Sequence, residues 1–524
     1  MAQDISGTAL ATTTVAVSHQ VAYRVRFDWT DAGFGSTGSW TNETAYVLSI
    51  RGDAQATDWR RSPAAVGHGV SNKLFIVMEN PLATAPFSGR RFSPSNALGP
   101  LYAYIGEGLA DGVRCIVEAG YYNGATPEYR RQITGYVAGL IENYANNTVE
   151  FEIRDRGSDS AGGQHTTELF TNYTAKQYLQ ALAGLFDRDL LEVGDQEFDE
   201  GLFIIPFAAL DNDDVWKEIH TVVESQCGQF FFDKDGDLHF RDGARLVRPH
   251  ANSWDNPTIS QFTFSVDDFA ACNPRYDVEN VWNHIVVQYY PRYVAIEQVV
   301  HNSSEVYVAP PGGMVTATAE FHYPVASLET PEADTDYLAV TAGGTDITDD
   351  IDIVLTESAY SAELEITNNN SNYAAYLVRL QLRGKPIISM HVNKYEVEDA
   401  ASIADRGRRT LPVSNPYIQS YRHAQLVGDF LLARLKDPVQ VITLDGAPAV
   451  PWLEVGDRVT VVESDNLGIN EDYFIARIET SIEAGSYTNS FVLMRAADLF
   501  AATDYFILGT SKYGTGAGHG HLFW

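Results

Sequence analysis

The sequence predicts a mainly β protein with a small α/β module, and three observations support this prediction. Apolar and polar residues alternate over much of the chain, Gly-, Asn- and Pro-rich turns separate these runs, and helical spacing is confined to a few segments. The chain has 524 residues, of which 45% are hydrophobic and 12% aromatic. This composition is enough for several domains with sizeable cores, and it excludes wholesale disorder.

Residues 1–160 are expected to form an all-β domain. The run Leu74–Met78 is apolar throughout, which is typical of a strand covered on both faces. Near residue 150 the pattern is instead one-sided, with Val149, Phe151 and Ile153 alternating with charged residues. We therefore predict a β-barrel or sandwich here.

Residues 161–275 are predicted to form the small α/β module. A helix should begin after Thr174, a suitable N-cap, and a second should begin near Asp214, since acidic residues stabilise a helix N-terminus. We expect the second helix to bury Trp216, Ile219 and Val223. The runs 230–232 and 238–240 flank an Asp-Gly turn and predict a hairpin.

Strands return after the module. We assign residues 276–309 and 385–500 to a second β domain, which contains one helix from about Tyr421 to Lys436. Residues 310–384 are expected to form an inserted β subdomain, and residues 501–524 form a Gly-rich C-terminal tail.

Charge and cysteine content narrow the possible functions. The formal net charge is −33, and a chain this acidic is a poor candidate for binding phosphate backbones. Three widely spaced cysteines, Cys115, Cys227 and Cys272, predict neither a disulfide framework nor a zinc site. The N-terminus lacks the basic start of a secretory signal. The longest apolar stretch, 201–210, is too short to span a bilayer, so we expect no membrane anchor.

No catalytic, cofactor-binding or metal site is predicted. Asp233, Asp235 and Asp237 suggest a calcium loop, but an EF-hand needs Gly at its sixth position and Glu at its twelfth, where this chain has Leu238 and Ala244. The sequence contains none of the common nucleophile, zinc-protease or phosphate-loop motifs. Carboxylate pairs are uninformative among 69 acidic residues.

Three groups of segments follow the order of a known family. The first group comprises 75–81, 89–96, 112–114, 132–137 and 149–155, with Gly89-Arg90-Arg91-Phe92-Ser93-Pro94-Ser95-Asn96 at its centre. The second is 216–233 with the turn Asp235-Gly236, and the third comprises 415–416, 436–438, 453–459, 472–475 and 508–511. Together they resemble the baseplate hub, or tail-tip hub, of tailed bacteriophages.

The resemblance implies a structural, non-enzymatic homotrimer in the virion tail tip, synthesised in the host cytoplasm. Each subunit would contribute two tube-like β-barrel domains to a pseudo-sixfold ring. The ring would join the hexameric tail tube, or a distal tail ring protein, to threefold tip components. The other implied partners are a tape measure protein and tip fibre or spike proteins, with DNA only in transit through the lumen. A carboxylate-lined lumen would repel phosphates and let DNA slide.

Two further predictions concern interfaces. Phe92, Ser93 and Pro94 lie in a loop that we expect to meet a neighbouring subunit. Phe523 and Trp524 end the tail and are candidate aromatic anchors for a partner. The main alternative function is a carbohydrate-binding or carbohydrate-cleaving β protein at the host cell surface. A tail-tip protein with an added wall-degrading activity is a third possibility.

Overall fold

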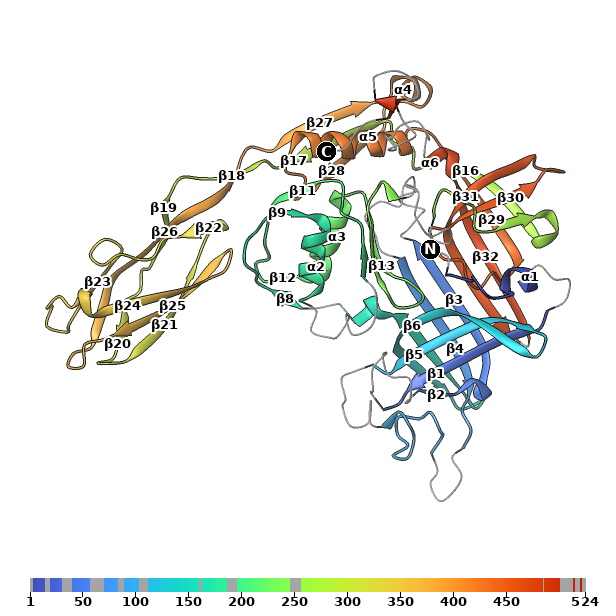
Figure 1. The fold of residues 1–524 in the computed structure, drawn as a ribbon, viewed down its shortest axis with the longest axis horizontal. Helices are drawn as coiled ribbons and strands as arrows, with labels where there is room; N and C mark the ends of the chain where they lie inside the picture. Colours follow the sequence, from blue (N-terminus) through green and yellow to red (C-terminus); the bar gives the residue numbers. More distant parts are fainter. Residues whose placement is uncertain are drawn as a thin grey trace.

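The structure is a computed structural model. It describes residues 3–14, 19–30, 40–56, 70–82, 89–102, 112–159, 163–185, 196–245, 256–483, 485–499, 512–513 and 519–520. A large sheet, a small module with two helices, a second helical module and a projecting arm follow one another across Figure 1.

The centre of the molecule is a 13-stranded sheet built from both ends of the chain. Its first half follows the short helix α1 (Leu10–Thr14). The strands of this half are β1 (Val21–Asp28), β2 (Thr41–Asn42), β3 (Val47–Ala56), β4 (Val70–Glu79), β5 (Arg114–Asn123), β6 (Thr126–Asn143) and β7 (Thr148–Asp155).

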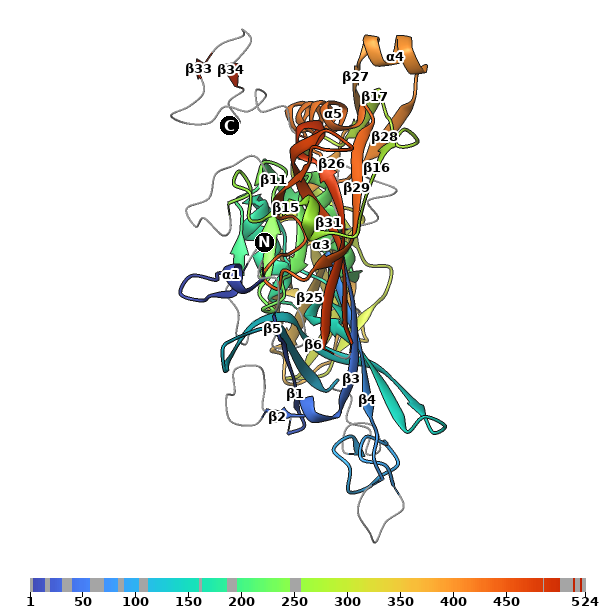
Figure 2. The same ribbon diagram turned by 90° about the vertical axis from the view of Figure 1, so that its right-hand side faces the viewer.

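The second half of the sheet comes from residues after 262. Its strands are β15 (Thr263–Ser265), β16 (Ala271–Asp277), β29 (Val439–Pro448), β30 (Arg458–Glu463), β31 (Ile469–Glu483) and β32 (Ser486–Arg495), and helix α6 (Ala496–Leu499) follows. The two halves join where β3 pairs antiparallel with β31, from Ser49 opposite Glu483 to Gln55 opposite Arg477. Figure 2 shows these long strands nearly edge-on.

The two halves repeat the same pairing pattern. In the first half the order is β3-β4-β7-β6, and in the second it is β16-β29-β32-β31. The long strand at the end of each set has a bulge at an alanine, Ala138 in β6 and Ala476 in β31. An equivalent backbone bond precedes each bulge: the Val137 amide donates to Val113 and the Ile475 amide to Asp457, both at 2.9 Å.

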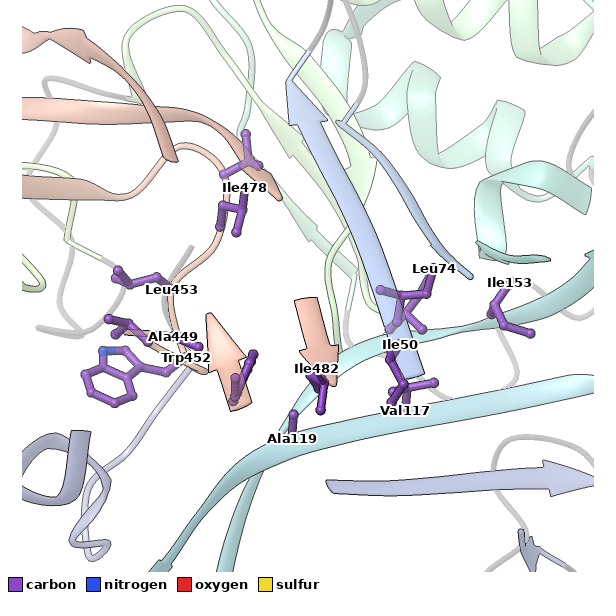
Figure 3. Packing of buried hydrophobic residues seen from close by; sticks show 14 of the residues in the cluster. Ile50, Leu74, Val117, Ala119, Ile153, Ala449, Trp452, Leu453, Ile478 and Ile482 are labelled. Carbon is purple, nitrogen blue, oxygen red and sulfur yellow. The ribbon is translucent and has the colours of Figure 1, made fainter. Parts of the chain in front are cut away.

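A single hydrophobic core lies under both halves. Ile50 and Leu74 of the first half share one cluster with Ile478 and Ile482 of the second, all at most 5% exposed. Figure 3 shows these side chains together with Trp452. Because apolar burial is continuous across the β3–β31 pair, the two halves form one body.

The small module lies beside the sheet. Its strands are β8 (Gln164–His165), β9 (Phe170–Thr174), β10 (Gln196–Phe198), β11 (Ile204–Ala208), β12 (Asp213–Asp214), β13 (Gln229–Phe232) and β14 (Leu238–Arg241). Helix α2 (Ala175–Ala183) begins with a capping box between Thr174 and Gln177, and the Asp214 carboxylate caps helix α3 (Val215–Ser225). Ile219 and Val223 are fully buried, whereas Trp216 packs on the edge of the module core.

A second helical module and the arm complete the chain. The module contains β17 (His284–Tyr289), β27 (Asn393–Glu398), α4 (Ala400–Arg406), β28 (Thr410–Ser414) and α5 (Tyr421–Leu435). The arm contains β18 (Arg292–Val294), β19 (Gln298–Asn302), β20 (Tyr307–Ala309), β21 (Met314–Glu320), β22 (Val325–Leu328), β23 (Tyr337–Val340), β24 (Ile351–Glu357), β25 (Ser361–Asn368) and β26 (Ala375–Ser389). Two short strands, β33 (Lys512–Tyr513) and β34 (His519–Gly520), lie near the C-terminus.

The predicted fold class is confirmed: the molecule is mainly β with a small α/β module. The strand, hairpin and helix patterns named above form strands, a hairpin and helices. The run Leu74–Met78 is not covered on both faces, however, because Phe75 and Val77 are only partly buried. The pairings among the described strands leave the large sheet open, so neither half is closed into a barrel by these pairings. The proposed domain boundaries remain predictions, and β15 and β16, placed by them before the second β domain, pair within the large sheet.

Substitutions of two glycines on β6 test how closely β6 and β7 approach each other. A Cβ at Gly135 would lie 1.8 Å from the Arg154 carbonyl oxygen, whereas one at Gly139 would lie 3.4 Å from the nearest atom of Glu152. We expect Gly135→Ala to lower the free energy of unfolding by about 2 kcal/mol or more, because the β6–β7 backbone must shift. Gly139→Ala should stay within about 0.5 kcal/mol. Urea denaturation of both variants measures the difference, and equal losses would contradict the close approach of β6 and β7 at Gly135.

Candidate functional site

The face of the large sheet that points away from the core carries many charged side chains. The registers of β31, β3, β4 and β7 place alternate residues of all four strands on the side away from the core. Acidic residues outnumber basic ones among the charged side chains of this face: Asp53, Glu79, Glu150, Glu152, Glu479 and Glu483 against Arg51, Lys73, Arg154 and Arg477. We call these ten residues the polar face.

Ion pairs hold much of this charge in place. Arg477 donates to both carboxylate oxygens of Asp53, at 2.8 and 3.0 Å, and also lies 2.8 Å from Glu479. On β7, Arg154 pairs with Glu152 at 2.8 Å. Exposed pairs of this kind add little stability, typically below about 1 kcal/mol each. They do neutralise Arg154 and Arg477, and six acids against four bases leave the face with an excess of negative charge.

The eight strands from β16 to β6, which we call the inner set, have two open edges. Beyond Tyr136, β6 pairs only with β7, so none of the described strands lies on the other side of 138–143. At the opposite end, β16 pairs with β29 alone among the described strands, and its residues 273–276 are exposed. Unpaired strand edges are ready to accept another strand.

A buried polar junction attaches the small module to both halves of the sheet. The Lys234 ammonium, in the β13–β14 turn, donates to the Leu453 carbonyl at 2.8 Å and to the Gln132 side chain at 3.2 Å. Thr134 in turn donates to the Lys234 carbonyl at 3.0 Å. Burial lowers the pKa of Lys234, while the nearby carboxylates of Glu454 and Asp457 oppose that effect. One lysine thus contacts β6 and the loop before β30.

A second buried group lies where the small module, the helical module and the arm meet. The Tyr417 hydroxyl donates to the Glu218 carboxylate, and the Tyr178 hydroxyl lies 3.2 Å from that of Tyr417. Burial raises the pKa of Glu218 to about 7, Asp213 adds to the rise, and Arg292 opposes it. The Arg292 guanidinium comes from the start of the arm, so this carboxylate lies at its attachment.

The predicted interface loop is only partly at the surface. Phe92 is fully buried and packs against Phe151 and Tyr46, with ring centroids 5.9 and 5.5 Å away. Ser93 is also buried and donates to Glu142 at 3.0 Å, whereas Pro94 is partly exposed. Phe92 therefore serves the core of its own chain, and contact with a neighbouring subunit stays a prediction for the rest of the loop.

Other predicted features can be located as well. Phe523 and Trp524 lie outside the described residues. Asp233 and Asp237 flank the predicted hairpin turn, with Gly236 at a positive φ of 89°. Within the described ranges, no three His, Cys, Asp or Glu side chains gather as metal ligands would. No helix in this part of the chain has the length and apolar character needed to cross a bilayer.

Sequence reasoning missed the polar face, the open edges and the Lys234 junction. Part of the face was visible, because the one-sided pattern of β7 already set Glu150, Glu152 and Arg154 apart from the core. The other strands carry mixed patterns, and only their register assigns them to the same face. A lysine between Asp233 and Asp235 gave no sign of burial.

The comparisons with known proteins found similarity only among solved structures. No family model and no curated protein matches the chain. The tail protein from Neisseria meningitidis MC58 is 11% identical, with a TM-score of 0.47, over 92% of this chain and 98% of that one. The 43 kDa tail protein of prophage MuSo2 from Shewanella oneidensis is 12% identical, with a TM-score of 0.46, over 91% and 99%. A type VI secretion system component from E. coli is 8% identical, with a TM-score of 0.37, over 87% and 75%.

Replacing Lys234 tests whether the Lys234 junction stabilises the protein. We expect Lys234→Met to lower the free energy of unfolding by about 2–3 kcal/mol, because buried carbonyl acceptors lose a charged donor. The control Lys394→Met changes an exposed lysine on β27 and should stay within about 0.5 kcal/mol. Chemical denaturation at pH 7 compares the two, and equal effects would exclude the junction as a source of stability.

The pKa of Glu218 predicts a pH dependence. Since its pKa in the folded chain, about 7, exceeds the ordinary glutamate value of 4.5, the folded state holds a proton that the unfolded state releases between these values. The wild type should therefore lose stability relative to Glu218→Gln as pH rises from 5 to 8, by about 2 kcal/mol. The difference in free energy of unfolding between the two proteins is free of the contributions of the other carboxylates, because both proteins contain them. A difference that does not change with pH would show that Glu218 titrates normally.

Proposed function

We propose that this chain is a structural, non-enzymatic subunit of a phage tail tip, and that three copies form a ring around a channel for DNA. The observation that carries the proposal is the repeated half-sheet. Two sets of four strands with the same order lie side by side in one chain, so one subunit supplies two equivalent wall segments. Three chains would supply six, which suits a part placed between sixfold and threefold structures.

The size of such a ring supports the proposal. The inner set has eight strands, from β16 to β6, so three copies give about 24 strands at about 4.8 Å each. With strands parallel to the ring axis, that circumference corresponds to a backbone diameter of about 37 Å, and any tilt of the strands widens it. Side chains occupy about 5 Å on each side. The remaining opening of about 27 Å has room for a DNA duplex.

The charge of the polar face supports transit of DNA. Facing the channel, it would present to passing phosphates an excess of carboxylates and four bases, three of which form ion pairs. A surface with few free cations releases no condensed counterions from DNA, so it offers no sequence-independent affinity. The DNA would slide without being held.

The first test is electron microscopy of the purified protein, with its mass measured in the same buffer. We expect threefold rings with a central opening at three times 57.8 kDa. A compact monomer without an opening at every concentration, together with turnover or binding in a polysaccharide screen, would favour the carbohydrate-active alternative and reject the ring.

Charge reversal tests which surface faces the channel. We expect Glu150→Lys/Glu152→Lys/Glu479→Lys rings to retain duplex DNA at low salt and release it as salt rises, whereas wild-type rings retain none. The matched control, Glu320→Lys/Glu363→Lys/Glu365→Lys, makes the same charge change on exposed positions of the arm strands β21 and β25. Measured by filter binding, equal retention by both variants would mean that the polar face does not line the channel.

A further inference from the structure

We infer that β6 of one copy pairs antiparallel with β16 of the next copy, in a register that the chain already displays between β31 and β3. This inference rests on the proposed ring and names the contact that closes it. The partner is a second copy of this chain, and the two surfaces are the open edges described above.

The internal repeat supplies the template. Matching the bulges aligns Ala138 with Ala476, and β6 with β31. The strand pairings then align β3 with β16. In the first half, Gly52 pairs with Leu74, and Leu74 pairs with Ile153. In the second half, Pro274 pairs with Ile442, and Ile442 pairs with Leu493. Ile153 and Leu493 are equivalent, because each is the last partner before the bulge. Gly52 and Pro274 are therefore counterparts.

The register of the contact follows from this alignment. In the chain, β31 and β3 pair with Glu479 opposite Asp53 and Thr480 opposite Gly52. The counterparts of Glu479 and Asp53 are Ile141 and Arg275. The predicted pairs between copies are Gly139 with Asp277, Leu140 with Tyr276, Ile141 with Arg275, Glu142 with Pro274 and Asn143 with Asn273.

The strand directions allow closure. All neighbours in the inner set, from β16 to β6, run antiparallel, and the set contains an even number of strands. The strands at its two ends therefore point in opposite directions. When copies are placed side by side in the same orientation, β6 meets the next β16 antiparallel, as β31 meets β3.

Exposure at the two edges indicates what the contact would bury. Ile141 is 65% exposed and Tyr276 is 60% exposed. In the chain's own β31–β3 contact, Ile478, the counterpart of Leu140, is only 2% exposed, whereas Leu140 itself is partly buried. Pairing would cover these apolar side chains and satisfy the backbone groups of both edges, except for the acceptor opposite Pro274, which has no amide hydrogen.

The charges of the two edges are complementary at Arg275. Arg275 would lie opposite Ile141, on the face that carries Glu150, since Ile141 and Glu150 are directly paired. Glu152 is also on this face, and its carboxylate lies beside Gly139, which has no side chain to block it. The contact thus places Arg275 of one copy next to the Glu150 and Glu152 carboxylates of the other. It also brings Asp277, opposite Gly139, to the same face, where its carboxylate accepts hydrogen bonds from Asn280.

Disulfide trapping tests the register in the full chain, with Cys272 changed to Ser to remove the neighbouring thiol. Directly opposite residues have Cα atoms about 4.5–5.5 Å apart, within the range that a disulfide spans. We expect Ile141→Cys/Arg275→Cys, and separately Asn143→Cys/Asn273→Cys, to give covalent dimers and trimers but nothing larger on non-reducing gels. The matched control, Ile141→Cys/Asn273→Cys, places the thiols on the same face but diagonally, about 7–8 Å apart, and should remain mostly monomeric.

The outcomes separate the contact from the ring itself. Threefold rings of the parent protein without cross-linking in either opposite pair, or with stronger cross-linking in the diagonal control, would overturn the register and leave the proposed function standing. No rings at any concentration would overturn the proposed function and the contact with it. Covalent ladders beyond the trimer would show an open chain of copies and reject closure at three.

Discussion

The pairing of β3 with β31 is the constraint on which the rest of this structure depends. Asp53 and Arg477 are 424 residues apart, yet this ladder makes one sheet from the two ends of the chain. The small module, the helical module and the arm are all inserted between these ends. Their chain segments must leave the sheet and return to it at fixed points. The common core beneath Ile50 and Ile482 ensures that the ladder cannot open without exposing apolar surface of both halves.

The polar junctions position the inserted parts on this frame. Apolar packing alone tolerates small shifts, whereas a buried ammonium needs its acceptors at hydrogen-bond distance. Lys234 has acceptors on both halves, Gln132 in the first and Leu453 in the second, so the hairpin bridges the joint between them. Glu218 plays a similar part at the arm, where its contact with Tyr417 links the small module to the helical module. Both junctions therefore fix the positions of the inserted parts relative to the sheet.

Local elements could be predicted from the sequence, and long-range pairing could not. The capping residue Thr174 and the alternation around Phe151 act over a few residues, so helix α2 and strand β7 form as expected. The repeat escaped detection because equivalent positions keep their backbone role while changing residue type. Gly52 corresponds to Pro274, and Ile141 corresponds to Glu479. The burial of Phe92 escaped detection for a related reason: an aromatic in a loop segment has the same pattern whether its ring packs inward or outward, and here Phe151 contacts it in the core.

Each open edge must pair with its specific partner strand and must also avoid pairing with other strands. An exposed strand invites any other strand, and proteins commonly limit this with a proline or a charge at the edge. Pro274 lacks an amide hydrogen, so a strand beside β16 receives one donor fewer than a regular ladder provides. Its counterpart Gly52 pairs with Leu74 on one side and Thr480 on the other, which shows that the same position can sit inside a continuous sheet. A partner strand must therefore match the side chains of β16 to compensate for the missing bond, which favours one specific strand over unspecific addition.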